Sequence, residues 1–215
     1  MDRFRATSGS SGSVLLREAN HRFANHLSLL MYLLDEEGEE TPLSQVRERL
    51  SGQVAAVALV HRLLAEEGES QLVEAGSYLT KLCDHLGKAC LNPRGIRCRV
   101  DAVRAVLPAE LCRNLGLIVN ELVTNAAKHA FRNRSEGLVT VVLRHDDGVW
   151  TIAVADDGVG FQRQDHTLVG MGRNLLHALA DGLGARCSCR VTPAGTIVAL
   201  RFRVDERCSN IGSVA

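Results

Sequence analysis

The hydrophobic spacing of this sequence changes character near residue 90, and that change limits the folds that the chain can form. Before it, apolar residues recur every three or four positions, as from Phe23 to Leu34, which is typical of a helix with one apolar face. After it, segments such as 96–100, 138–144 and 149–155 are alternating or β-rich, which is typical of strands. The sequence therefore predicts a helical first part and an α+β second part.

The helical part reads as two helices joined by a short acidic loop. The first apolar stripe ends before Gly38, and Thr41-Pro42 has the form of an N-cap followed by a first-turn proline. A second stripe then runs from Leu43 to Leu64. Because one helical hairpin cannot bury two such stripes well, we expect two copies to form a dimeric four-helix bundle.

The second part predicts helices packed on one face of a mixed sheet. We expect helices over 75–89, from Pro108 to about Ala130, and over 171–181. Asp146-Asp147-Gly148 is typical of a hairpin turn, and two further strands, 186–191 and 196–204, flank Pro193. These changes of pattern predict a tail over 1–13, a helical hairpin over 14–70, an α+β domain over 71–205 and a tail over 206–215.

Charge and composition exclude several classes of protein. Lys plus Arg and Asp plus Glu are both 25, so a generic, strongly basic nucleic-acid binder is disfavoured. Residues 1–75 carry a net charge of −5 and residues 76–215 one of +5, which suits an anionic ligand in the second part. The longest apolar run, 54–60, is far shorter than the about 20 residues of a membrane span. With no secretory leader and no C-x-x-C pair among seven cysteines, we expect a cytoplasmic protein with reduced thiols.

His21 lies on the exposed side of the first predicted helix. Two residues rotate a helix by about 200°, so His21 points away from the stripe that begins at Phe23. Glu18 and Asn25 share its face. An exposed imidazole beside a carboxylate and an amide can act as a nucleophile, although an ordinary solvent-facing histidine has the same spacing.

Glu121, Asn125 and Lys128 form a polar row on the long helix predicted after Pro108. Their spacing of four and three places them on one helix face. An amide oxygen can ligate Mg²⁺, an ammonium can approach phosphate and a carboxylate can accept a proton. The same row would also suit a polar outer helix face.

Three further segments carry weak signals for a nucleotide. Asp156 ends a predicted strand, where its carboxylate can accept a hydrogen bond from an exocyclic amine, and Gly158 and Gly160 let the backbone pass close to a planar ring. Gly170 and Gly172 lie at the start of a predicted helix, where free N–H groups can face phosphate. Thr196 opens the last strand, where its hydroxyl can hydrogen-bond a base.

In order and spacing, these segments together resemble the sensor histidine kinases of two-component systems. LLREANHRFANHLSLL resembles the H-box of the HWE-type kinases and their sister family, whose pattern is H-R-x-K-N. NELVTNAAKHAF resembles their N-box, and DDGVGF and GMGRNLL resemble their two glycine-rich boxes. PAGTIVALRF resembles the closing strands of the GHKL, or Bergerat, ATP-binding fold, and the resemblance covers about residues 14–204.

The resemblance implies ATP and Mg²⁺ as cofactors and a role for each matched residue. His21 would accept the phosphoryl group, with Glu18 and Asn25 beside it, and Glu121 would be the general base or orient a water. It also implies these nucleotide contacts: Asn125 on Mg²⁺, Lys128 and His129 near the phosphates, Asp156 on the adenine amine with Gly158 and Gly160 beside the ring, Gly170 and Gly172 over the phosphates, and Thr196 supporting Asp156.

The sequence departs from the family pattern at three places. Ala24 replaces the usual Lys of the H-box, which removes a cation beside His21. The W-x-E element of the strict HWE group is absent, so the sister family fits better. The segment from Phe161 to Gly170 is a short ATP lid. Because only about 13 residues precede the H-box, we expect no sensor domain in this chain and a separate sensor protein as a possible partner.

The predicted function is therefore autophosphorylation of His21 and transfer to an aspartate on the receiver domain of a response regulator, by a homodimer with no nucleic-acid or membrane partner. One alternative is a histidine phosphotransferase whose ATP-binding domain is degenerate. The other is an anti-sigma-type Ser/Thr kinase of the same ATP fold, although such kinases lack the histidine hairpin.

Overall fold

The computed structural model describes residues 43–66, 71–132, 134–159 and 171–204. The chain divides into two compact units, residues 1–53 and residues 54–215, and the second unit contains nearly all of the described structure. In the described ranges, no helix is long and apolar enough to cross a membrane. The first predicted helix and its histidine lie outside the described residues.

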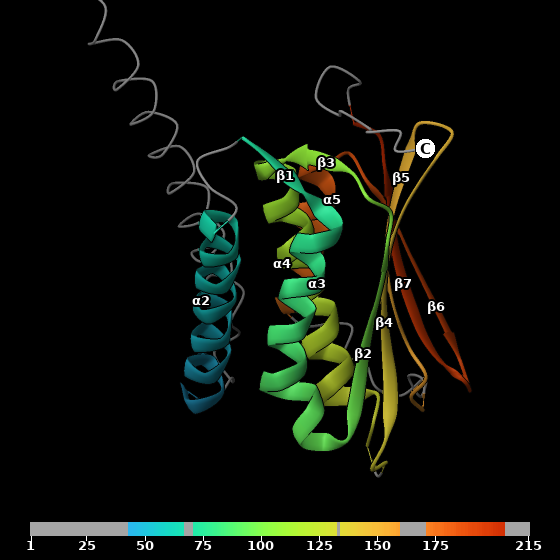
Figure 1. Ribbon diagram of the computed structural model, residues 1–215. Helices are drawn as coiled ribbons and strands as arrows, with labels where there is room; N and C mark the ends of the chain where they lie inside the picture. Colours follow the sequence, from blue (N-terminus) through green and yellow to red (C-terminus); the bar gives the residue numbers. More distant parts are fainter. Residues whose placement is uncertain (1–42, 67–70, 133, 160–170, 205–215) are drawn as a thin grey trace, which may run out of the picture. The chain divides into compact units, whose positions relative to one another are not determined.

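A five-stranded mixed sheet forms one layer of the second unit (Figure 1). Its spatial order is β2-β4-β5-β7-β6, in which β2 and β4 are parallel and the other neighbours are antiparallel. The bounds of these strands are Ile96–Ala102 for β2, Gly137–Asp146 for β4, Val149–Asp156 for β5, Arg186–Thr192 for β6 and Gly195–Phe202 for β7. The predicted mixed sheet is confirmed.

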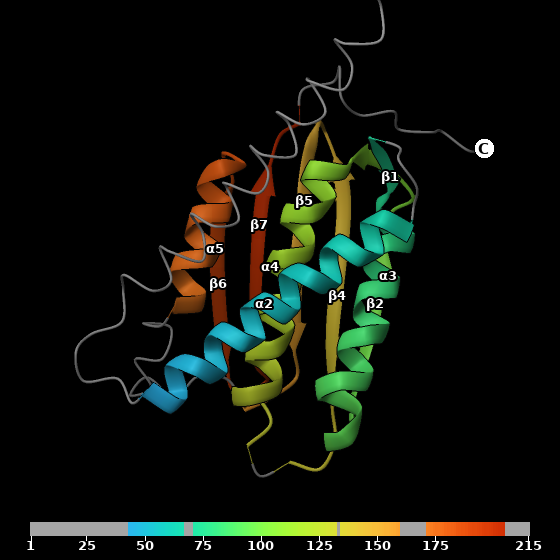
Figure 2. The same ribbon diagram turned by 90° about the vertical axis from the view of Figure 1, so that its left-hand side faces the viewer.

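Among the described residues, helices cover one face of this sheet only (Figures 1 and 2). They are α3 (Ala75–Leu86), α4 (Ala109–His129) and α5 (Met171–Gly182). Figure 2 shows the three helices side by side in front of the strands. Along β4 and β5, buried residues alternate with half-exposed ones, because successive strand side chains point to opposite faces. The buried set faces the helices, so the sheet has one covered and one open face.

The hairpin between β4 and β5 has the turn that the sequence predicts. Asp147 and Gly148 both adopt positive φ, 49° and 72°, as a two-residue turn with the twist of its flanking strands requires. The register pairs Asp146 with Val149 directly across it. A local signal, Asp-Asp-Gly, therefore fixes the register of the two central strands.

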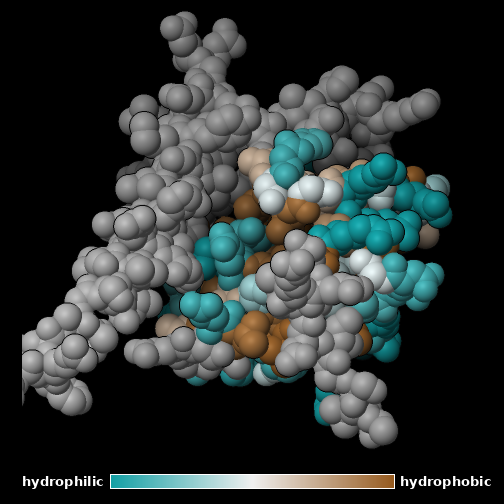
Figure 3. All heavy atoms as spheres, turned by 90° about the horizontal axis from the view of Figure 1, so that it is seen from above, coloured by the Kyte–Doolittle hydropathy of each residue, from teal (hydrophilic) through white to brown (hydrophobic). Residues whose placement is uncertain are grey.

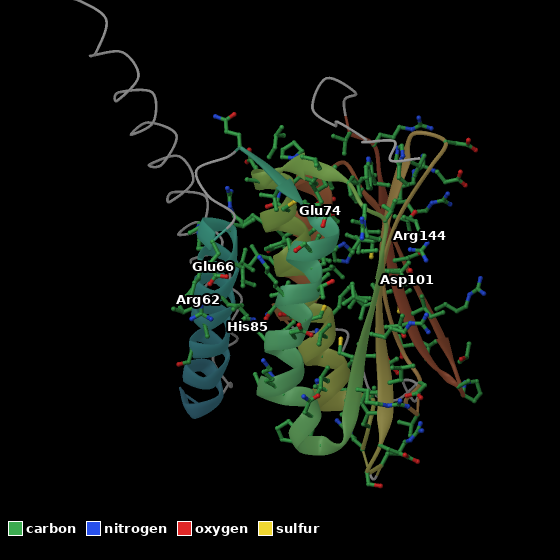
Figure 4. The ribbon with its side chains drawn as sticks, in the orientation of Figure 1. Arg62, Glu66, Glu74, His85, Asp101 and Arg144 are labelled. Atoms are coloured by element: carbon green, nitrogen blue, oxygen red, sulfur yellow. The ribbon has the colours of Figure 1, made fainter. Side chains whose placement is uncertain are left out.

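Glu74 links the start of α3 to the backbone at Ala105. Its carboxylate accepts hydrogen bonds from the backbone N–H groups of Gly76 and Ser77 at 3.1 and 2.6 Å, and from Ala105 at 3.2 Å. Figure 4 labels this side chain at the start of the helix. Glu74 ends β1 (Leu72–Glu74), which pairs with β3 (Val106–Pro108). This short two-stranded sheet was not predicted, because three residues are too few to show an alternation.

Helical boundaries match the sequence expectations with one difference. α4 begins directly after Pro108, as proline at a helix start predicts. The described part of α2 is Leu43–Glu66, and Thr41 and Pro42 lie outside the described residues. The helix expected over 75–89 ends earlier, at Leu86, and continues as a π-helical turn, η1 (Gly87–Leu91). A short 3-10 turn, η2 (Asn92–Arg94), then leads to Gly95 at φ 72°, which turns the chain into β2.

The contact between α3 and α4 is close because Gly116 has no side chain. A Cβ atom on Gly116 would lie 1.9 Å from the Tyr78 hydroxyl oxygen and 3.2 Å from a Val60 methyl. Tyr78 is fully buried, and its hydroxyl has no hydrogen-bond partner among the described residues. The space between the two helices is therefore filled by the Tyr78 ring.

We predict that Gly116→Ala destabilises the protein by about 1–3 kcal/mol, because a packed core accommodates an added methyl only by strain. Tyr78→Phe removes the atom in closest conflict, so the double variant should recover part of that loss. Urea unfolding of the four proteins measures this coupling. Gly182→Ala, which meets nothing within 4 Å, is the control and should be neutral or slightly stabilising; equal losses in Gly116→Ala with and without Tyr78→Phe would contradict the packing account.

Candidate nucleotide site

Glu121 and Asn125 are joined on α4, as their spacing predicts. The Asn125 side-chain nitrogen donates to a Glu121 carboxylate oxygen at 2.9 Å. Because this bond engages the side-chain nitrogen of Asn125, the amide oxygen faces away from Glu121 and can act as an acceptor. Glu121 is only 8% exposed, so the interpretation of this row as an ordinary outer helix face is wrong for Glu121.

The last turn of α4 is basic. It carries Lys128, which is exposed, and His129, which is half-buried. Cations in this position interact favourably with the negative end of the helix dipole. The Arg94 guanidinium also donates to the carbonyl of Ala127, so three basic side chains gather at this helix end.

Asp156 is held at the end of β5 by two backbone donors. Its Oδ1 accepts hydrogen bonds from Gly158 N at 3.0 Å and Thr196 N at 3.2 Å. Burial raises the pKa of Asp156, and the bonds from Gly158 and Thr196 lower it in part. Thr196 is buried and pairs with Asp156 in the register of β5 and β7.

The turn after Asp156 lies against the end of α4. Val159 N donates to the carbonyl of Ala130 at 2.9 Å, and a Cβ on Gly158 would stand 2.3 Å from that same oxygen. Only glycine fits at this distance. The two most informative motifs of the sequence, separated by some 30 residues, therefore meet: the acidic end of β5 and the basic end of α4 form one site.

Asp157 and Arg134 hold this turn in place, and the sequence analysis assigned neither of them. The Asp157 carboxylate accepts from Leu138 N at 2.7 Å, and Asp157 N donates back to Leu138 O at 3.2 Å. The Arg134 guanidinium donates to the Asp157 carbonyl. The second acidic residue of DDG was the available signal, because a carboxylate next to a strand end can accept a hydrogen bond from a backbone N–H near the start of a neighbouring strand.

Some predicted site residues lie outside the described part of the chain. They are Glu18, His21, Asn25, Gly160 and Gly170. Gly172 lies in the first turn of α5. The described residues that converge are the pair on α4, the basic end of that helix, and the Asp156 turn with Thr196.

Comparison with known proteins agrees with this geometry. Residues 93–202 match the family model described as histidine kinase-like ATPase domain, and residues 18–90 match the model described as histidine kinase. The chain belongs to the histidine kinase family. The resemblance drawn from the motifs is confirmed, and so is the GHKL-type fold.

Relatives of the kinase align with most of its length. Blue-light-activated histidine kinase 2 of Erythrobacter litoralis is 28% identical over 89% of this chain, and sensor histidine kinase PdtaS of Mycobacterium tuberculosis is 29% identical over 92%. The chain spans 58% and 41% of the lengths of these two relatives. The solved Erythrobacter litoralis EL346 blue-light activated histidine kinase superposes with a TM-score of 0.71 at 26% identity, covering 94% of this chain and 62% of that one.

We predict that the stability of this kinase depends on pH through Asp156. Because its pKa is raised above the ordinary 3.8, the folded protein keeps this proton at pH values where the unfolded chain has lost it. The unfolding free energy should therefore fall as the pH rises through the window just above 3.8. Asp156→Asn should flatten that dependence in urea unfolding measured from pH 4 to 7, whereas Asp146→Asn, at the exposed hairpin, should leave it unchanged. An unaltered slope in Asp156→Asn would contradict this account.

Proposed function

We propose that this chain binds Mg²⁺-ATP, phosphorylates its own His21 and passes the phosphoryl group to an aspartate on the receiver domain of a response regulator. The observation that carries the nucleotide part is the carboxylate of Asp156, fixed by two backbone donors where the turn after β5 meets the basic end of α4. Family membership supports a kinase with an ATP-binding domain.

The chemistry of Asp156 suits an adenine. Its Oδ1 accepts hydrogen bonds from backbone N–H groups of the protein. Its second oxygen carries lone pairs that can accept a hydrogen bond from an exocyclic amine. Gly158 has no side chain to obstruct a flat ring beside this carboxylate. Lys128, at the end of α4, supplies positive charge for the phosphates, and His129 is proposed to lie near them. The net charge of +5 over residues 76–215 attracts the nucleotide as a whole.

The donor chemistry at Asn125 fits Mg²⁺, which prefers oxygen ligands and binds few protein groups together with phosphates. The bond from the Asn125 nitrogen to Glu121 leaves its oxygen as the ligand. Bound there, the ion would neutralise phosphate charge. Gly170 and Gly172 are proposed to lie over the phosphates, with Gly160 beside the ring.

In the proposed first step, a ring nitrogen of His21 attacks the γ-phosphorus of ATP. The bond between the γ-phosphorus and its bridging oxygen breaks, and ADP leaves with that electron pair. Glu121 accepts the proton that the imidazole loses, and Glu18 and Asn25 orient the ring. In the second step a receiver aspartate attacks the same phosphorus and His21 leaves. Such catalysis consists mainly of positioning and charge neutralisation.

The proposed assembly is a homodimer. The two predicted helical stripes before residue 65 need more apolar partners than one hairpin supplies. The receiver domain would dock beside the histidine that it dephosphorylates.

A histidine phosphotransferase with a degenerate nucleotide domain is the competing function. It would retain His21 while losing adenine and Mg²⁺ contacts. The intact set around Asp156 and the oriented Asn125 amide favour a working nucleotide site.

Incubation with γ-labelled ATP and Mg²⁺ tests the proposal. We expect an acid-labile, base-stable label that is lost in His21→Ala while calorimetric ATP binding persists. A chain that neither binds ATP nor takes up label would support the phosphotransferase instead.

We further predict that Asn125→Ala lowers the rate of labelling by about 100-fold or more, the scale seen when one group that stabilises a transition state is removed. The dimer, measured by light scattering, should be unchanged. Asn114→Ala, on the same helix but outside the site, is the matched control and should label like the parent protein. Equal labelling by Asn125→Ala and Asn114→Ala would remove Asn125 from the mechanism.

A further inference from the structure

The open face of the sheet carries a concentration of arginine that the kinase site does not use. Alternation and register place six exposed arginines on this face, and they are Arg97 and Arg99 on β2, Arg144 on β4, Arg186 and Arg190 on β6, and Arg201 on β7. The chain as a whole has no net charge. This face is therefore strongly basic in a protein that is not.

Few carboxylates offset this charge. Two acids lie among the strand residues of the open face. Asp101 is already bound to Arg144, and Asp146 ends β4 beside the hairpin turn. Figure 4 shows that pair at the sheet. In the described part of the chain no ion pair neutralises Arg186, Arg190 or Arg201. Seen from above, Figure 3 shows hydrophilic residues gathered toward the right, which is the side of the sheet in Figure 1.

The arrangement costs stability in the free protein. Arg186 and Arg201 stand directly opposite each other on neighbouring strands, and like charges in that position are destabilising. Protection of sheet edges explains charged residues on β2 and β6, but it needs neither a single sign of charge nor arginine on the inner strands β4 and β7. Like charges paired across strands do not stabilise the fold, and such a departure from the pairing rule is typical of a functional surface.

Between the arginines, the side chains on the open face are small and partly apolar. One row across the sheet runs Arg99, Thr140, Ala155, Ile197, Arg190. Ile197 is 46% exposed. The next row places Val142, Ala153, Ala199 and Ser188 side by side. Four strand spacings separate β2 from β6, about 19 Å, which leaves room for one α-helix of about 10–12 Å diameter with arginines along both sides.

We propose that the open face of this sheet docks an acidic amphipathic helix of a partner protein. Aliphatic side chains of that helix would pack on Ile197 and the alanines, and carboxylates on its two flanks would pair with Arg99 on one side and Arg190 on the other. Arginine suits this role because its planar guanidinium binds carboxylates through two parallel hydrogen bonds. A nucleic acid fits less well, because Trp150 and Phe202 are buried and the open-face strand positions offer no aromatic ring for base stacking.

Fluorescence anisotropy with a labelled peptide probe tests this surface on the full chain. The probe is an 18-residue helical peptide with a leucine stripe flanked by glutamates. Two matched peptides replace the glutamates by glutamine or the leucines by serine. At about 0.15 M salt, where exposed charges are screened beyond about 8 Å, we expect the first peptide to bind and each matched peptide to bind at least about tenfold more weakly.

The protein variants locate the binding. Arg99→Glu with Arg190→Glu should weaken the peptide at least about tenfold, a change of about 1.4 kcal/mol. Arg62→Glu with Arg104→Glu makes the same charge change at exposed positions off this face and should leave binding within about twofold. ATP binding by calorimetry should be the same in both variants, which separates this surface from the kinase site.

Equal weakening in the two double variants would overturn the proposal, because net charge alone would then explain binding. So would tighter binding of an 18-nucleotide single-stranded DNA, or of phosphatidylserine vesicles, with the same dependence on Arg99 and Arg190. Failure of the glutamate peptide to bind better than the glutamine peptide would also overturn it.

Discussion

The nucleotide site depends on the hydrogen bonds that two backbone N–H groups donate to the Asp156 carboxylate. One donor is two residues away and the other is 40 residues away, so a single carboxylate fixes both the turn after β5 and the start of β7. Burial raises the pKa of this carboxyl, and the hydrogen bonds from Gly158 and Thr196 lower it in part. Hydrogen bonds to ionised groups are the stronger kind.

The nucleotide site depends, secondly, on the close approach of backbone segments to one another. Gly195, at φ 129°, would bring a Cβ within 1.8 Å of the Asp156 carbonyl, and Gly158 lies against Ala130 in the same way. Both positions combine a strand end with a neighbouring segment at distances that a side chain would forbid. Because Gly158 and Gly195 have no side chain, the carboxylate, the end of α4 and the last hairpin can lie close together.

Local signals predicted most of the fold correctly. Asp147-Gly148 set a hairpin, Pro108 marked the start of α4, and the β-rich runs became strands at nearly the expected residues. Sequence reasoning did not predict the pairing of β1 with β3, the burial of Glu121 or the bonds of Asp157. Each of these depends on partners distant in the chain. Leu107 pairs with Val73, and the backbone N–H of Leu138 donates to the Asp157 carboxylate.

The sequence by itself determined the elements, the motif residues and the family, because turn chemistry, periodicity and spacing act over a few residues. Only the tertiary structure decided which sheet face is covered and what gathers on the other. Arginines on β2, β4, β6 and β7 are scattered along more than 100 positions, and nothing in their spacing relates them. Strand register brings them onto one face, since pairing across strands, not order along the chain, sets which side chains are neighbours.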